Sequence, residues 1–108
     1  MILVLDIGNT NIKAGIYEGE KLAATWRIST DLRKTSDEYG VALVAMLQAR
    51  AIDPDRITGI ILSSVVPAIN FTIEHTLRDY LHKKPLVVGA GIKTGLNIRT
   101  NNAREIGG

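Results

Sequence analysis

The beginning of the chain brings together a carboxylate, a polar turn and a lysine, in the segment Asp6-Ile7-Gly8-Asn9-Thr10-Asn11-Ile12-Lys13. A carboxylate at the end of a buried strand is a fixed negative charge that can hold a divalent cation through its oxygen atoms. The backbone N–H groups of a tight turn, the Thr10 hydroxyl and the Lys13 ammonium can bind phosphate oxygens. The segment therefore indicates a site for a phosphorylated ligand, with a metal ion beside Asp6.

An ordinary hairpin is the alternative, since Asp often caps a turn and Gly often supplies a positive φ there. Two features favour the phosphate site. The uninterrupted apolar run of residues 2–5 predicts a central strand buried on both faces, and Asp6 ends that run. Lys13 then follows the turn on the less apolar face of the next strand.

Two further strands are predicted to flank the turn and the first strand. Apolar residues alternate with polar ones in residues 11–17, and they alternate again in residues 21–29 after a short turn. We expect these strands and residues 2–5 to pair in antiparallel fashion, because only short turns connect them. Trp26 lies on the apolar face of the third strand, so it is expected to pack in the core.

The first helix is predicted from its start signal. Thr35 and Glu38 have the spacing of a capping box, in which each side chain bonds the backbone N–H of the other residue. The helix is expected to run to about Arg50. Asp53-Pro54-Asp55 is expected to end it, because proline cannot continue the hydrogen-bonding ladder.

The second half of the chain repeats the order of strand and helix. Residues 57–62 form a short apolar run, and we expect a strand parallel to the first because a helix lies between them. Pro67 suits the first turn of a second helix, which is expected to end near residues 83–85. Residues 86–88 are expected to form the last strand of the sheet.

Two serines, Ser63 and Ser64, follow the fourth strand. In open α/β sheets, ligands gather at the carboxyl ends of the strands, so both serines are candidates for a ligand contact. They are equally typical of strand ends and helix caps, and both interpretations stay open. His75 and His82 are the only two histidines, and without further His or Cys to complete a metal site we expect them on the helix surface.

Composition excludes several classes of protein. The 108 residues are 45% hydrophobic and 22% charged, which suits one globular domain with its own core. The net charge is only +2 and the basic residues are spread along the chain, so nucleic-acid binding is not expected. There is no cysteine, and no apolar run is long enough to span a bilayer. We expect a cytoplasmic protein without membrane contact.

The motif Asp-x-Gly-x-Thr-x-x-Lys resembles the first phosphate loop of the superfamily of acetate and sugar kinases, heat-shock chaperones and actin. The assembled segments resemble one family of that superfamily, the type III pantothenate kinases, which are also known as accessory transcriptional activators of the Baf type. The resemblance extends over the whole chain. It is carried by residues 6–13, Lys34-Thr35-Ser36-Asp37-Glu38-Tyr39, Ser63-Ser64-Val65-Val66-Pro67, residues 89–98 and Asn102-Ala103-Arg104-Glu105-Ile106-Gly107.

This resemblance implies an α/β fold of the ribonuclease-H-like type, with a mixed sheet whose first three strands are antiparallel and whose fourth and fifth are parallel. Helices pack on that sheet. The implied activity is ATP-dependent phosphorylation of pantothenate, the first step of coenzyme A biosynthesis. The family also implies Mg²⁺, a monovalent cation (K⁺ or NH₄⁺) and a homodimer of the full-length protein.

Site residues follow from the resemblance position by position. ATP would be bound by the first motif, with Asp6 also acting on Mg²⁺; its members are Asp6, Ile7, Gly8, Asn9, Thr10, Asn11, Ile12 and Lys13. Pantothenate would be bordered by the segment of residues 89–98 and contacted by Thr100, Gly107 and Gly108. Physically, such a site works by positioning the reacting groups and by offsetting the negative charge of the phosphates.

The chain departs from the family pattern near its last residue. In the family, an Asp that acts as the base and an Arg that holds the pantothenate carboxylate follow the position of Gly108. Thr100, Ala103 and Gly108 also replace the residues usual in the family, namely Tyr, Pro and Ala. We therefore expect residues 1–108 to be the N-terminal domain of a two-domain kinase, without the base and without pantothenate phosphorylation of its own.

Three alternatives remain open on the sequence. Another small-molecule kinase of the superfamily would share the phosphate loop, because the loop does not select the acceptor. A nucleotide-binding regulatory module of the Baf type would bind nucleotide without turnover. A ribonuclease-H-like nuclease would use Asp6 as a metal ligand but would need several convergent carboxylates. Loop or helix-start positions are expected for Asp31, Asp37, Glu38 and Asp55.

Overall fold

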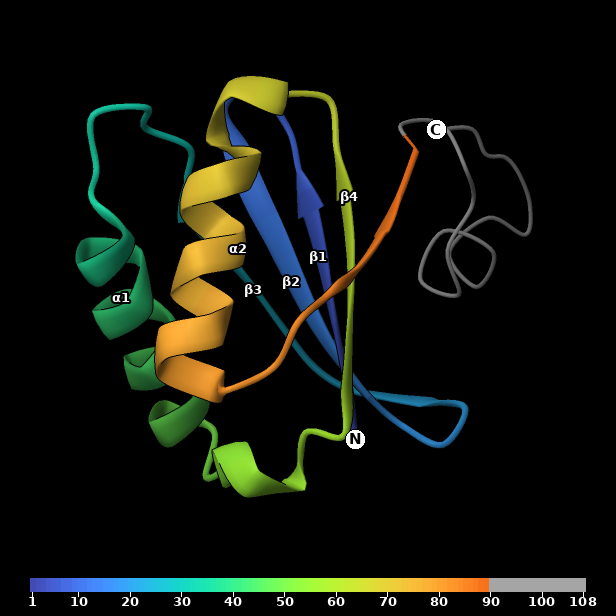
Figure 1. Cartoon of the computed structure of the whole chain (residues 1–108). Coiled ribbons are helices and arrows are strands. Elements are labelled where there is room, and N and C mark those ends of the chain that lie inside the picture. Colours follow the sequence, from blue (N-terminus) through green and yellow to red (C-terminus); the bar gives the residue numbers. More distant parts are fainter. Residues whose placement is uncertain (90–108) are drawn as a thin grey trace.

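The structure, a computed structural model, describes residues 1–89. Its elements are β1 (Ile2–Ile7), β2 (Asn11–Glu18), β3 (Lys21–Ser29), α1 (Ser36–Ala49), the 3-10 helix η1 (Pro54–Arg56), β4 (Gly59–Ser64), α2 (Pro67–Leu81) and β5 (Leu86–Val88). The five strands form one sheet in the order β3-β2-β1-β4-β5, and α1 and α2 lie side by side on one face of it (Figure 1).

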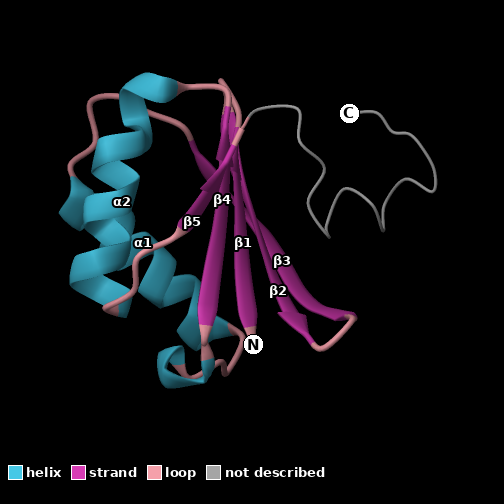
Figure 2. Ribbon diagram, turned by 45° about the vertical axis from the view of Figure 1, so that its right-hand side comes forward, coloured by secondary structure: helices cyan, strands magenta, loops and turns pink. Residues whose placement is uncertain are grey.

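The strand directions confirm the predicted mixed sheet. β2 pairs antiparallel with both β1 and β3, whereas β4 is parallel to β1 and β5 is parallel to β4. Short turns allow only antiparallel neighbours, and each parallel step needs a helical crossover, which α1 and α2 provide. Figure 2 shows that both crossover helices cover the same side of the sheet, and no helix of residues 1–89 lies on the other side.

The core lies between the sheet and the two helices. Leu3, Leu5 and Ile7 alternate along β1 toward the helices and are almost completely buried. Tyr39 and Leu43 of α1 pack on this layer. Ile69, Ile73 and Leu77 of α2 do so as well. The predicted core position of Trp26 is confirmed, since only 7% of it is exposed.

The first helix ends close to the predicted residue, Arg50, but for a different reason. It begins with the predicted capping box, since Thr35 accepts a bond from the N–H of Glu38 at 3.1 Å and Glu38 accepts one from the N–H of Thr35 at 2.8 Å. It ends at Ala49 because Ala51 adopts a positive φ of 56° and its N–H bonds the Gln48 carbonyl. This is a Schellman ending, which stops the helix before any proline is reached. Pro54 instead begins the separate turn η1.

The fourth strand is shifted relative to the prediction of residues 57–62. It begins at Gly59 and includes both serines, because Ser63 and Ser64 continue the register beside Asp6 and Ile7. The preceding residue Thr58 donates its N–H to the Met1 carbonyl at 2.8 Å, outside the strand. β4 includes both serines because β1 continues beside them as far as Ile7. Polar side chains alone do not end a strand that is still paired.

Candidate functional site

Three polar side chains lie next to one another across the centre of the sheet. Asp6 of β1 is paired with Lys13 of β2 on one side and with Ser63 of β4 on the other. Residues opposite each other on neighbouring strands point to the same face, and the flanking Leu5 and Ile7 point into the core beneath the helices. Asp6, Lys13 and Ser63 therefore share the sheet face opposite α1 and α2, near the carboxyl ends of β1 and β4.

The carboxylate of Asp6 is held in place by a neighbouring hydroxyl. Ser63 donates its hydroxyl to Oδ1 of Asp6 at 3.1 Å, and Ser63 is itself only 6% exposed. This bond leaves Oδ2 of Asp6 and the other lone pairs for a ligand. Lys13, the register partner of Asp6 on β2, is exposed, so its ammonium is accessible to a ligand.

The turn that joins β1 to β2 exposes unpaired backbone donors. The N–H of Gly8 bonds the Asn11 carbonyl at 2.9 Å and closes the turn. Asn9 and Thr10 are exposed, and among residues 1–89 no partner accepts a hydrogen bond from the N–H of either residue. A side chain at position 8 would bring its Cβ within 3.2 Å of that same Asn11 carbonyl, so glycine suits the tight turn. Exposed N–H groups of this kind bind anions.

The structure separates the roles of the eight residues of the motif. The side chains of Ile7 and Ile12 are 0% and 2% exposed and belong to the core, so these two residues can meet a nucleotide only through their backbone. Asp6, Thr10 and Lys13 instead present polar side chains on the surface or at partly buried positions.

The two serines at the end of β4 have different contacts. Ser63 donates its hydroxyl to the Asp6 carboxylate, whereas Ser64 accepts a hydrogen bond from the N–H of Val66 at 3.0 Å, within the turn that leads from β4 to α2. The N–H of Val65 bonds the Ile7 carbonyl at 3.0 Å, which holds this connection against the end of β1. Both serines are thus strand-end residues, and neither caps α2, because its N-cap is Val66 and no side chain bonds there. Of the two, Ser63 lies in the candidate site.

Two residues near the site were not singled out by the sequence. Arg27 is the register partner of Lys13 on β3, so a second cation lies on the same sheet face. Thr30, which follows β3, donates its hydroxyl to the Gly8 carbonyl at 2.8 Å. The pairing of the strands at residues 11 and 29 is the signal that could have placed Thr30 beside the turn.

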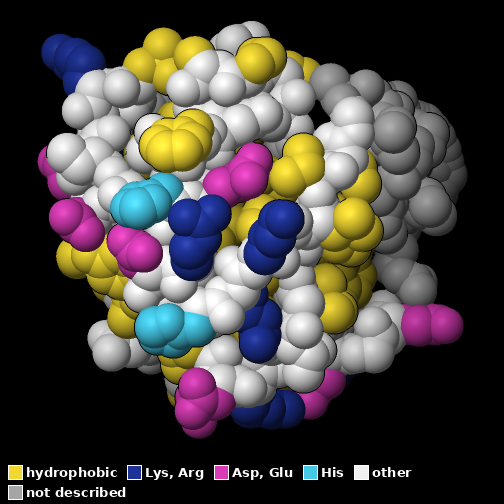
Figure 3. All heavy atoms as spheres, in the orientation of Figure 1, with side chains coloured by type: hydrophobic (Ala, Val, Ile, Leu, Met, Phe, Trp, Pro, Cys, Tyr) yellow, Lys and Arg dark blue, Asp and Glu magenta, His cyan; other side chains and the backbone are white. Residues whose placement is uncertain are grey.

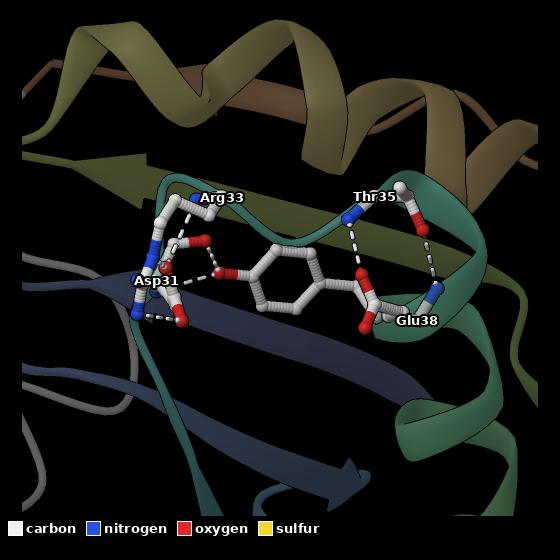
Figure 4. Close-up of polar contacts among 5 residues, drawn as sticks. Asp31, Arg33, Thr35 and Glu38 are labelled. Carbon is white, nitrogen blue, oxygen red and sulfur yellow. Dashed lines mark hydrogen bonds and ion pairs between the residues drawn. The ribbon is translucent and has the colours of Figure 1, made fainter.

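The loop after Thr30 is held by a compact set of polar contacts (Figure 4). The Tyr39 hydroxyl accepts a hydrogen bond from the N–H of Asp31 and donates one to its carbonyl, both at 2.8 Å. Burial raises the pKa of the Tyr39 phenol. Hydrogen bonds from the side chain and the backbone N–H of Arg33 lower the pKa of Asp31, so that carboxyl stays ionised as an acceptor.

Within residues 1–89 no three His, Cys, Asp or Glu side chains lie close enough together to hold a metal ion. Among those residues Asp6 thus belongs to no such group, whereas a ribonuclease-H-like nuclease needs several convergent carboxylates. A single carboxylate does fit Mg²⁺ that arrives with a phosphorylated ligand, because Mg²⁺ keeps several waters and takes other ligands from phosphates. His75 instead lies within 3.1 Å of Asp79 on the surface of α2.

The remaining predictions concern surface charge, membrane spans and the residues expected to contact the substrate. On the face seen in Figure 1, basic side chains lie close to acidic and histidine side chains (Figure 3). Neither helix in residues 1–89 has the length and apolar character needed to cross a membrane. The predicted substrate residues Thr100, Gly107 and Gly108, together with residues 90–98, lie outside the described residues.

Comparison with known proteins identifies related chains. A sequence model of the type III pantothenate kinase family matches residues 2–108. Among solved structures, the ROK hexokinase of Thermus thermophilus superimposes with a TM-score of 0.60 at 17% identity, over 82% of this chain and 34% of that one. A protein of Porphyromonas gingivalis assigned as an N-acetylglucosamine kinase superimposes with a TM-score of 0.60 at 21% identity, over 83% of this chain and 34% of that one.

The two solved structures support a conclusion about the fold only. At such low identity the two structures establish the fold alone, which is the one predicted for the acetate and sugar kinase superfamily. The chain spans about a third of the length of either structure.

Proposed function

This chain belongs to the type III pantothenate kinase family, and from that membership we propose that it provides the phosphate-binding half of a kinase that phosphorylates pantothenate with ATP. The product, 4'-phosphopantothenate, is the first intermediate toward coenzyme A. The observation that carries the proposal is the row of Asp6, Lys13 and Ser63 beside a turn whose N–H groups at Asn9 and Thr10 are unpaired within residues 1–89.

Each part of this row has a task in binding ATP. The N–H groups of Asn9 and Thr10 and the Thr10 hydroxyl bind phosphate oxygens, and the Lys13 ammonium offsets their negative charge. Asp6, oriented by Ser63, holds Mg²⁺ that accompanies the phosphates, and Mg²⁺ supplies further neutralisation of charge on them. The exposed position of Lys13 beside the partly buried Asp6 suits these tasks.

The proposal also assigns the residues that bind pantothenate, the acceptor of the phosphoryl group. Thr100, Gly107 and Gly108 contact pantothenate, and a carboxylate beyond Gly108 accepts the proton of its hydroxyl. Residues 1–108 then form the N-terminal domain of a two-domain kinase, which is in keeping with the third of each kinase structure that the chain spans. The full-length protein works as a cytoplasmic homodimer that uses K⁺ or NH₄⁺.

Isothermal titration of the purified chain with MgATP tests the phosphate site. We expect weak binding that Lys13→Met lowers about tenfold or more, since a charge-assisted hydrogen bond is lost. Asp6→Asn should weaken binding most when Mg²⁺ is present. Lys21→Met is the matched control, because Lys21 is exposed at the opposite end of β2 and β3 and should leave binding unchanged.

Two results would count against the proposal. If the unaltered chain does not bind MgATP at millimolar concentration, or if Lys13→Met binds as well as the unaltered chain, the phosphate site is elsewhere or absent. Turnover of pantothenate by the 108-residue chain would contradict the proposed need for a further carboxylate. Tight nucleotide binding without any turnover would instead favour a regulatory module.

A further inference from the structure

Thr30 holds the turn between β1 and β2, residues 8–10, at two points. Its hydroxyl donates a hydrogen bond to the Gly8 carbonyl at 2.8 Å. Its backbone N–H donates another to the Thr10 carbonyl at 2.9 Å. One residue thus bonds the carbonyls on either side of Asn9, from a position 22 residues away from Gly8 in the sequence.

These two bonds decide the direction in which the turn presents its donors. No described peptide bond is cis, and in a trans peptide the C=O and the N–H point in opposite directions. Because the Gly8 carbonyl points to Thr30, the N–H of Asn9, which belongs to the same peptide unit, points away from Thr30. The Thr10 carbonyl orients the N–H of Asn11 in the same way. The hydroxyl of Thr30 therefore directs the free donor of Asn9 toward the open side of the turn.

Thr30 is itself fixed from both sides. β3 ends at Ser29, which is paired with Asn11 at the start of β2. On the other side, the backbone of Asp31 makes two hydrogen bonds of 2.8 Å with the hydroxyl of Tyr39, which is 2% exposed in α1 (Figure 4). The position of Thr30 is thus set by the sheet and by the first helix together.

We propose that Thr30 is a positioning residue that arranges the Gly8–Thr10 turn for phosphate before the ligand arrives. This inference rests on the proposed function, since it assumes that the turn binds the phosphates of a nucleotide. Donors that are held in the binding geometry in advance need not be ordered when the ligand binds, so affinity improves. Thr30 acts through the turn and does not touch the ligand.

The test compares three variants of the full chain. Thr30→Val keeps the shape and the backbone N–H but removes the hydroxyl, and Thr30→Ser keeps the hydroxyl. Thr76→Val is the matched control, because the Thr76 hydroxyl likewise donates to backbone carbonyls, those of Ser36 and Thr72, but lies away from the turn on α2. Thermal unfolding of each variant shows how much of any effect is general destabilisation.

Two readouts follow each variant. Without nucleotide, ¹⁵N relaxation should show the order parameters of Asn9 and Thr10 falling from about 0.85 toward 0.6 in Thr30→Val only. With MgATP, Thr30→Val should bind about three- to tenfold more weakly, which is what one lost hydrogen bond is worth. Thr30→Ser should restore both properties, and Thr76→Val should change neither. If Thr30→Val does not fold, Tyr39→Phe removes the support of Asp31 and should loosen the same amides.

The outcomes separate this inference from the proposed function. If the unaltered chain binds MgATP and Thr30→Val binds equally well, Thr30 does not position the turn. The same conclusion follows if Thr76→Val weakens binding as much as Thr30→Val does. If the unaltered chain does not bind MgATP, the proposed function fails, and the amide order parameters still decide whether Thr30 holds the turn.

Discussion

Gly40 lies where α1 packs against α2, and its replacement by alanine should destabilise the fold although alanine is the better helix former. A Cβ built on Gly40 would lie 2.6 Å from Cγ of the Tyr80 ring and closer still to Cδ1 and Cε1. Moving the ring away would break the hydrogen bond that the Tyr80 hydroxyl donates to Asp37 at 2.8 Å. Alanine at position 40 must therefore push the two helices apart or break that bond.

Two opposing terms set the size of the effect. Alanine in the middle of a helix is favoured over glycine by about 1 kcal/mol. Overpacking a well-filled contact costs about 1–3 kcal/mol. The overpacking term is larger, so Gly40→Ala should lower the free energy of unfolding by about 1 kcal/mol, and the melting temperature of a domain of this size by about 4–8 °C.

A double-mutant cycle with Tyr80→Ala isolates the contact. In the Tyr80→Ala background the ring is gone, so Gly40→Ala should raise the melting temperature because only the helix preference remains. Thermal unfolding followed by circular dichroism measures all four proteins. The reasoning would be refuted if Gly40→Ala stabilised the unaltered chain, or if its effect had the same sign and size in both backgrounds.

Three further predictions concern the helix cap, the loop and the site. Thr35→Ala should cost about 1 kcal/mol by removing the cap of α1, whereas Thr35→Ser should be nearly neutral, as measured by urea unfolding. Because burial raises the folded pKa of Tyr39 above 10.0, its contribution to stability is complete below about pH 10 and is lost as the pH rises through the folded pKa. Tyr39→Phe should therefore lose less stability than the unaltered chain between about pH 9 and 11, and equal slopes of melting temperature against pH would contradict this. Ser63→Ala should weaken Mn²⁺ binding in the presence of nucleotide about three- to tenfold by freeing the Asp6 carboxylate, and unchanged Mn²⁺ relaxation would exclude that role.

Much of the fold was predictable because its signals are local. The alternation of residues in β2 and β3, the capping box at Thr35 and the proline that opens α2 act over a few neighbouring residues. The parallel pairing of β1 and β4 was predictable from the helix between them, because a helical crossover is the usual connection between parallel strands. The cause of the end of α1 was mispredicted, because a left-handed alanine at position 51 has no signature in the sequence.

The candidate site also has a part that the sequence predicts and a part that only the fold brings together. Asp6, Gly8, Thr10 and Lys13 lie in one short segment, so their types and spacing are enough to indicate a phosphate turn. The residues that orient this segment come from elsewhere in the chain: Ser63 bonds Asp6 across 57 residues, and Thr30 bonds Gly8 across 22. Strand register brings them together, and register depends on how the whole sheet packs against its helices. The amino-acid sequence therefore specified the groups that can bind phosphate, while the folded chain specified their directions.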